Sequence, residues 1–122
     1  MTKAHYDLLV VMTQPPLIGA QSKEALDTAL VSATFDRKTA LAFVGEGVLQ
    51  LLPDQQPDRV DSKGIQAMLK ALPLYDLDAV FVQQTSLESR KLKADELLLE
   101  AEPLSDTALA DLIASSNNHL VF

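Results

Sequence analysis

Four polar residues stand where an α/β protein would keep its chemistry. Ala79–Val82 is an uninterrupted apolar run, typical of a strand that is buried on both faces of a parallel sheet. Gln83, Gln84, Thr85 and Ser86 follow it directly. Ligands and catalytic groups of open α/β sheets gather just past the carboxyl ends of such strands. None of the four is an acid, a base or an activated nucleophile, so the sequence predicts a well-placed loop without a catalytic group.

Ser86 is the hydroxyl in this loop that could act as a nucleophile, with Thr85 beside it. It does not lie in a Gly-x-Ser-x-Gly elbow, and neither His5 nor His119 is an evident partner base. We interpret Ser86 as the N-cap of a helix that it begins. A hydrolase that uses Ser86 is kept as an alternative hypothesis, because it predicts reaction with a serine-directed probe.

Two glycines, Gly45 and Gly47, lie between an apolar run and a second apolar segment, as phosphate-binding loops do. They lack the third glycine of a dinucleotide fingerprint and the Gly-Lys-Ser/Thr of a P-loop. A tight turn is the favoured reason for them. The alternative is a stand-alone domain that binds a small molecule or nucleotide at Gly45–Gly47.

The remaining charged residues indicate structural roles. Asp76 and Asp78 precede the Ala79–Val82 strand, so they lie at its amino end, where turn and capping roles are expected rather than a paired-carboxylate site. His5 and His119 would need further converging ligands to hold a metal ion. A basic cluster of Arg90, Lys91 and Lys93 is interpreted as a solvated helix face; binding of an anion or acidic partner is its alternative. No cofactor, metal site or catalytic residue is predicted.

Composition limits the function classes further. The chain has 122 residues, a hydrophobic fraction of 48% and a net charge of −7, so it predicts one globular domain that does not by itself bind nucleic acid. It has no cysteine, which excludes disulfides, thiolate metal sites and thiol catalysis by this chain. No signal-peptide core or membrane-length apolar run is present, and a soluble cytoplasmic protein without membrane contact is expected.

Strand-like and helix-like segments alternate about five times along the chain. This alternation predicts a single α/β domain with an about five-stranded, mostly parallel sheet and helices on both faces. Helical spacing is found in the segments between the strands, including Ile65–Leu72. The predicted strands are Tyr6–Met12, Thr39–Val44, Ala79–Val82, Leu97–Leu99 and His119–Phe122.

One predicted helix is apolar on nearly all sides. In Val48–Leu52 only Gln50 is polar. A helix of this kind must be covered on more than one side. We expect the domain core to cover one side and a partner chain to cover the other, which makes a candidate interface of four residues: Val48, Leu49, Leu51 and Leu52.

Four segments together resemble the C subunits of TusBCD sulfur-relay complexes, in the DsrE/DsrF-like family. They are GEGVLQLLPD at 45–54, LYDL at 74–77, FVQQTSL at 81–87 and HLVF at 119–122. The resemblance spans essentially residues 1–122 in order and at similar spacing, and the GVLQLLP block is its most distinctive part.

The resemblance implies a role as a structural subunit without an enzymatic activity of its own. In that family, B-like, C-like and D-like subunits, two copies of each, form a heterohexamer that passes persulfide sulfur towards 2-thiolation of the tRNA wobble uridine. The relay cysteine belongs to the D subunit and follows the strand equivalent to Ala79–Val82. Gln83–Ser86 would then be a degenerate relay-site loop. A DsrEFH-type complex of dissimilatory sulfur oxidation is an alternative that this resemblance leaves open.

Overall fold

The five strands in the described part of the chain run parallel in one sheet. The computed structural model describes residues 5–15, 21–52 and 67–122. The sheet has the order β4-β3-β2-β1-β5, and each of its four strand pairs is parallel. The predicted α/β class with a five-stranded parallel sheet is confirmed. The strands are β1 (Leu8–Met12), β2 (Thr39–Phe43), β3 (Val80–Gln83), β4 (Glu102–Leu104) and β5 (Asn118–Val121).

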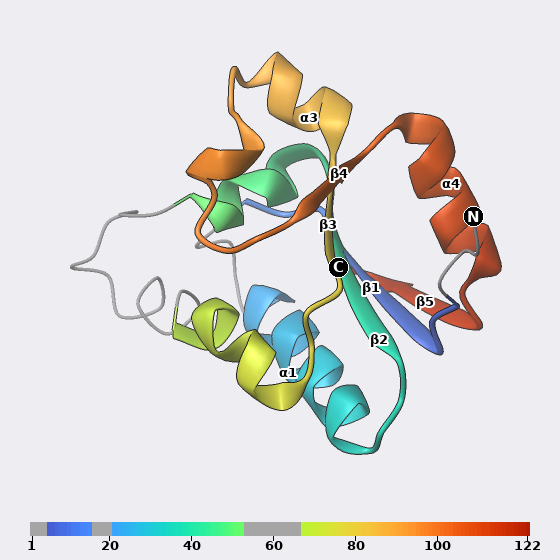
Figure 1. Ribbon diagram of the computed structural model, residues 1–122. Helices are drawn as coiled ribbons and strands as arrows, with labels where there is room; N and C mark the ends of the chain where they lie inside the picture. The colour runs from blue at the N-terminus through green and yellow to red at the C-terminus, as the bar shows by residue number, and fades with distance from the viewer. Residues whose placement is uncertain (1–4, 16–20, 53–66) are drawn as a thin grey trace.

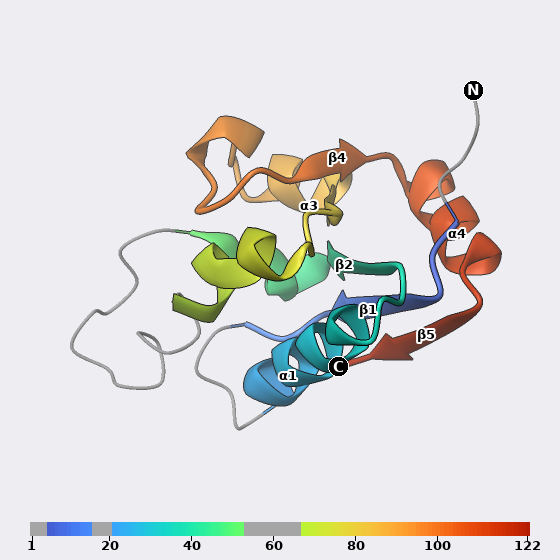
Figure 2. The same ribbon diagram turned by 60° about the horizontal axis from the view of Figure 1, so that its bottom comes forward.

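Helices cover both faces of this sheet (Figure 1). On one face lie α1 (Gln21–Thr34) and a helical stretch at 67–71 that continues into the short 3-10 helix η2 (Leu72–Tyr75). On the other face lies α4 (Asp106–Ser115), which Figure 2 shows well apart from α1. None of the helices in the described ranges is long and apolar enough to cross a membrane.

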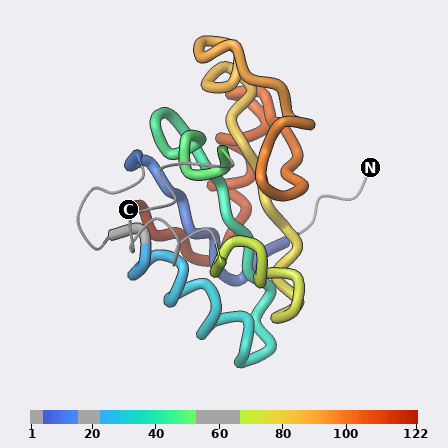
Figure 3. The backbone as a smooth tube through the Cα atoms, turned by 90° about the vertical axis from the view of Figure 1, so that its left-hand side faces the viewer, coloured from blue at the N-terminus to red at the C-terminus, as the bar shows by residue number. Residues whose placement is uncertain are grey.

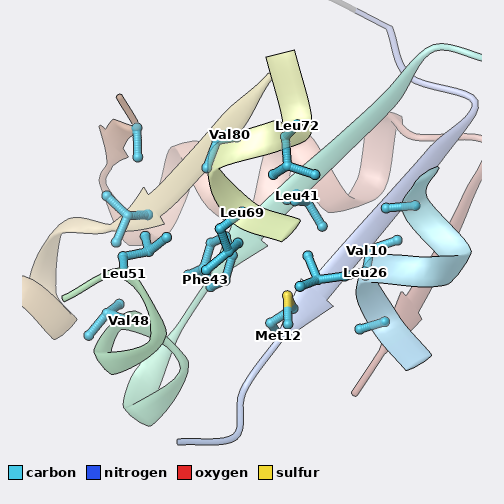
Figure 4. Packing of buried hydrophobic residues seen from close by; sticks show 14 of the residues in the cluster. Val10, Met12, Leu26, Leu41, Phe43, Val48, Leu51, Leu69, Leu72 and Val80 are labelled. Atoms are coloured by element: carbon cyan, nitrogen blue, oxygen red, sulfur yellow. The ribbon is translucent and has the colours of Figure 1, made fainter. Parts of the chain in front are cut away.

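Alternate side chains of the inner strands pack in two hydrophobic cores, one on each face of the sheet. Val10 and Met12 of β1 point into the core that contains Leu26 of α1, as Figure 4 shows, whereas Leu9 and Val11 pack in the core that contains Leu109 of α4. Each of these four side chains in β1 is at most 4% exposed. Burial on both faces explains why these strands are continuous apolar runs instead of alternating apolar and polar residues.

The strand predicted at Leu97–Leu99 is wrong, because the fourth strand is Glu102–Leu104. The three leucines form bends and pack, partly buried, against the larger core. β4 is an edge strand, and edge strands tolerate the charge of Glu102 and the missing N–H of Pro103. Those two residues made the segment look unlike a strand.

Other boundaries shift by a few residues. β1 begins at Leu8 instead of Tyr6, and the terminal strand is Asn118–Val121 instead of His119–Phe122. The helix predicted at Ile65–Leu72 is helical at 67–71, and its first residues lie outside the described ranges.

A tight 3-10 turn, η1 (Gly45–Leu51), leads away from the carboxyl end of β2. It lies beside α3 (Gln84–Ser89) at the same end of the sheet (Figure 3). Gly45 has a φ of 56°, a left-handed conformation that favours glycine. A Cβ on Gly47 would lie 2.0 Å from the carbonyl oxygen of Met12, so only glycine fits there. The tight turn expected at these glycines is confirmed.

We predict that Gly47→Ala destabilises the domain more than Gly45→Ala. The Cβ at position 47 meets backbone that cannot move aside cheaply, and overpacking of this kind costs about 3 kcal/mol. At position 45 nothing lies within 4 Å of the new Cβ, and only the left-handed backbone is penalised, by about 1 kcal/mol. Urea unfolding of both variants measures the difference. Equal losses, or a larger loss for Gly45→Ala, would contradict this account of the turn.

Candidate functional site

The polar loop predicted to hold the site is placed at the carboxyl end of β3. Gln83 ends the strand and α3 begins at once with Gln84, so Thr85 and Ser86 lie inside the helix. The N-cap predicted at Ser86 is therefore wrong: the N-cap is Gln83, whose side chain makes no capping hydrogen bond. The helix starts directly after the last strand residue, which leaves the Ser86 hydroxyl available for another contact.

Ser86 is buried, with 5% of its surface exposed, and its hydroxyl is engaged on both sides. Oγ accepts a hydrogen bond of 2.9 Å from the backbone N–H of Gly45 and donates one to Oε1 of Gln83. The same Gln83 oxygen also accepts from the Gly45 N–H at 3.4 Å. The hydroxyl therefore joins the turn after β2 to the end of β3.

Asp106, in the first turn of α4, completes this cluster. One carboxylate oxygen, Oδ1, accepts from Nε2 of Gln83 at 3.1 Å and from the hydroxyl of Thr85 at 3.0 Å. Asp106 was not among the predicted site residues, although the sequence contains a signal for it. It directly follows the N-cap Ser105, whose hydroxyl accepts a hydrogen bond of 3.1 Å from the Ala108 N–H. The start of a helix that follows a parallel strand belongs to the same edge of the sheet as the loop after β3.

The rest of the polar side chains here stabilise α3. Nε2 of Gln84 donates to Glu88 at 3.0 Å, one turn further along the helix. Arg90 donates from Nη1 to the Ser86 carbonyl at 3.2 Å and to the Ser89 hydroxyl at 3.0 Å. A cation that binds the last carbonyls of a helix stabilises its end. For Arg90 the geometry favours the structural interpretation of the basic cluster.

The arrangement provides no activated nucleophile in the part of the chain that is described. The Ser86 hydroxyl has two hydrogen-bond partners, the backbone N–H of Gly45 and the side-chain amide oxygen of Gln83. Neither is a base that could take the proton of the hydroxyl. His5 lies elsewhere, with its Nε2 atom 2.8 Å from Oδ1 of Asn117, and His119 lies in the edge strand β5. Over the described ranges no group of three or more His, Cys, Asp or Glu side chains could hold a metal ion.

The four residues of the candidate partner interface differ in exposure. Val48 and Leu51 are 0% exposed and pack in the domain's own core, as Figure 4 shows. Three residues per turn place these two on one side of η1. Leu49 and Leu52 are only partly buried. Because the domain itself covers Val48 and Leu51, the partner interface stays a prediction for Leu49 and Leu52 alone.

Comparison with known proteins finds relatives that span most of the chain. A model of the DsrE/DsrF-like family matches residues 7–122. The "Protein TusC homolog" of Pseudomonas aeruginosa is 40% identical over 106 residues, covering 87% of this chain and 89% of the relative. That of Aliivibrio fischeri is 30% identical over 112 residues, covering 92% and 95%.

A solved structure with the same fold is also found. The crystal structure of the ychN protein from E. coli superimposes with a TM-score of 0.81 and covers 96% of this chain and 99% of that one. The two sequences are 20% identical, so this likeness bears on the fold alone.

We predict that Ser86→Ala destabilises the domain by about 1–3 kcal/mol, because it removes a buried acceptor from the Gly45 N–H and a donor from Gln83. Thr85→Ala is the matched control, since it removes one hydroxyl of the same cluster at an exposed position and costs about 0.5 kcal/mol. Urea unfolding gives both values, and amide exchange at Gly45 should accelerate only in Ser86→Ala. An unchanged Gly45 exchange rate would rule out the proposed linkage.

Proposed function

This chain belongs to the DsrE/DsrF-like family, and we propose that it is a non-catalytic subunit of a sulfur-relay complex. The complex would be a heterohexamer of B-like and D-like subunits with this chain, two copies of each, and would support 2-thiolation of the tRNA wobble uridine. The names of the two relatives, both "Protein TusC homolog", support a place in such a complex.

The observation that carries this proposal is the chemistry of the loop after β3. A relay protein must bear a thiol there to form a persulfide, because the transferred sulfur is held by a sulfur–sulfur bond. This chain has no cysteine at any position, and the end of β3 and the first turn of α3 hold Gln83, Gln84, Thr85 and Ser86 instead. The buried Ser86 hydroxyl is occupied by two hydrogen bonds. In this proposal, the junction of β3 and α3 serves as a stable surface beside a partner's cysteine, and sulfur transfer belongs to the D-like subunit.

Assembly with the two partner chains tests this proposal. Co-expression with the neighbouring B-like and D-like chains, followed by size exclusion with light scattering, should give one peak near the mass of two copies of each chain. Persulfide, detected by mass spectrometry, should be found on the D-like cysteine. If this chain elutes alone as a monomer in the presence of both others, it is not a subunit of such a complex.

We predict that Leu52→Asp prevents assembly and leaves the isolated domain folded. Leu52 is partly exposed at the end of η1, where a charge stays hydrated in the free subunit but would be buried unpaired in a complex. Circular dichroism of the isolated chain and light scattering of the co-expressed chains give the two readouts.

Two further variants control for this substitution. Leu51→Asp places the same charge at a 0% exposed core position and should unfold the domain itself. Ala110→Asp places it on the exposed side of α4 and should leave both fold and assembly intact. A folded Leu52→Asp chain that still assembles would exclude the end of η1 from the interface.

A further inference from the structure

A cleft of about 570 Å³ opens at the amino ends of β3 and β4, at the opposite end of β3 from Gln83. Its walls are apolar and polar in nearly equal parts, and Val80, Phe81 and Leu99 are among the apolar residues. Tyr6 lies against Phe81 edge to face, with their ring centroids 6.0 Å apart and an angle of 72° between the planes. An aromatic and aliphatic lining of this kind fits an apolar or amphipathic side chain.

Three carboxylates surround this apolar lining, and no basic residue is among the described residues that form it. They belong to Asp78, Glu100 and Glu102, all exposed. Within the described parts of the chain, none of the three makes an ion pair or a side-chain hydrogen bond. Burial, followed by the nearby charges of Glu102 and Asp78, raises the pKa of Tyr6. The cleft is therefore a site of negative potential with an apolar interior.

Exposed apolar side chains extend this surface beyond the cleft. Pro73 lines the cleft, and the next two residues of η2, Leu74 and Tyr75, are 84% and 50% exposed. Large apolar side chains this exposed mark interaction surfaces when they gather beside a binding cleft. An occupant that covers both the cleft and η2 must be larger than a single small molecule.

We propose that this cleft binds a basic peptide segment of a partner protein. One lysine or arginine side chain enters the cleft, with its aliphatic stem against the neighbouring rings of Tyr6 and Phe81 and its charge near the three carboxylates. The aromatic ring of Tyr6 also lines the cleft, and a cation–π contact with it would add to the attraction for the same charge. Apolar residues that flank the basic residue pack on Leu74 and Tyr75.

Charge complementarity separates this occupant from others. A nucleic acid would bring phosphates to an acidic cleft on a chain of net charge −7. A small cation alone would rely on exposed ion pairs, which contribute little. A peptide segment adds burial of apolar area to these ion pairs. Because the cleft and the Gln83–Ser86 loop lie at opposite ends of β3, this proposal does not depend on the proposed function.

The two tyrosines of the chain make a direct test possible, because Tyr6 lies in the cleft and Tyr75 lies beside it. The full chain is labelled with 3-fluorotyrosine, and its two fluorine NMR signals are assigned with Tyr75→Phe. The probe is the peptide acetyl-Leu-Arg-Leu-Lys-Leu-amide, with acetyl-Leu-Gln-Leu-Gln-Leu-amide and n-butylamine as controls. We expect the basic peptide to shift the Tyr6 signal saturably, with an affinity at least about tenfold higher than that of either control.

Matched charge variants show whether the carboxylates of the cleft are responsible. Glu100→Gln with Glu102→Gln should weaken peptide binding about fivefold to tenfold, the effect of losing two exposed ion pairs. Glu24→Gln with Asp27→Asn makes the same charge change on exposed positions of α1 and should leave the affinity within about twofold. Circular dichroism checks that both double variants are folded.

Three results would overturn the proposal. The first is a Tyr6 signal that the basic peptide leaves unmoved. The second is an equal loss of affinity in the two double variants, since it would reflect the overall charge of the chain. The third is butylamine binding as tightly as the peptide, since it would indicate a site for a small cation.

Discussion

The close approach of Gly47 to the end of β1 sets the geometry of the carboxyl edge of the sheet. The carbonyl of Met12 accepts a hydrogen bond of 3.0 Å from the Val44 N–H, and the backbone of Gly47 passes against the same carbonyl. The chain can turn this sharply after β2 because Gly45 adopts a positive φ. The turn then directs the Gly45 N–H towards Ser86 and the side chains of Val48 and Leu51 into the core. The contact between the backbones of Gly47 and Met12 therefore positions both the hydrogen-bonded polar cluster and the core packing of η1.

The polar cluster joins three successive crossovers of the sheet. Gly45 follows β2, Gln83 ends β3, and Asp106 begins the helix after β4. Because the strands are parallel, these three points meet at one edge, and hydrogen bonds join them in sequence. A cluster whose members satisfy one another is rigid, and opening it would leave buried groups without partners. Such an edge is suited to presenting a fixed surface, which agrees with a role as a structural partner.

Apolar runs made most of the sheet predictable from sequence. β1 and β2 are buried on both faces, and β3 is buried on one face and partly buried on the other, so their burial leaves a continuous apolar signal in the residues themselves. β4 gave no such signal because an edge strand of three residues can contain Glu102 and Pro103. The apolar run Leu97–Leu99 was wrongly predicted to be a strand, because a loop that packs against the core also contains apolar residues.

The place of the four polar residues Gln83–Ser86 in the fold was predictable, but their contacts were not. The rule that polar residues gather after buried parallel strands placed Gln83–Ser86 correctly at the edge of the sheet. The start of α3 was missed, since glutamine is a weak signal for an N-cap, and the role of Ser86 was missed with it. The bond from Ser86 to Gly45 spans 41 positions, and that from Thr85 to Asp106 spans 21. Pairings over such distances depend on how the crossovers pack, which local patterns do not specify.

The two ends of β3 satisfy their polar groups in different ways, and the difference follows from burial. At the carboxyl end Ser86 is buried, so its hydroxyl needs protein partners and finds them in Gly45 and Gln83. At the amino end Asp78 and Glu102 are exposed, so water can solvate their carboxylates, and no side chain in the described ranges pairs with them. Their charges begin to cost free energy only when an occupant displaces that water. An occupant that is itself cationic offsets this cost, whereas a neutral or anionic one does not, so the exposed carboxylates favour a cationic occupant.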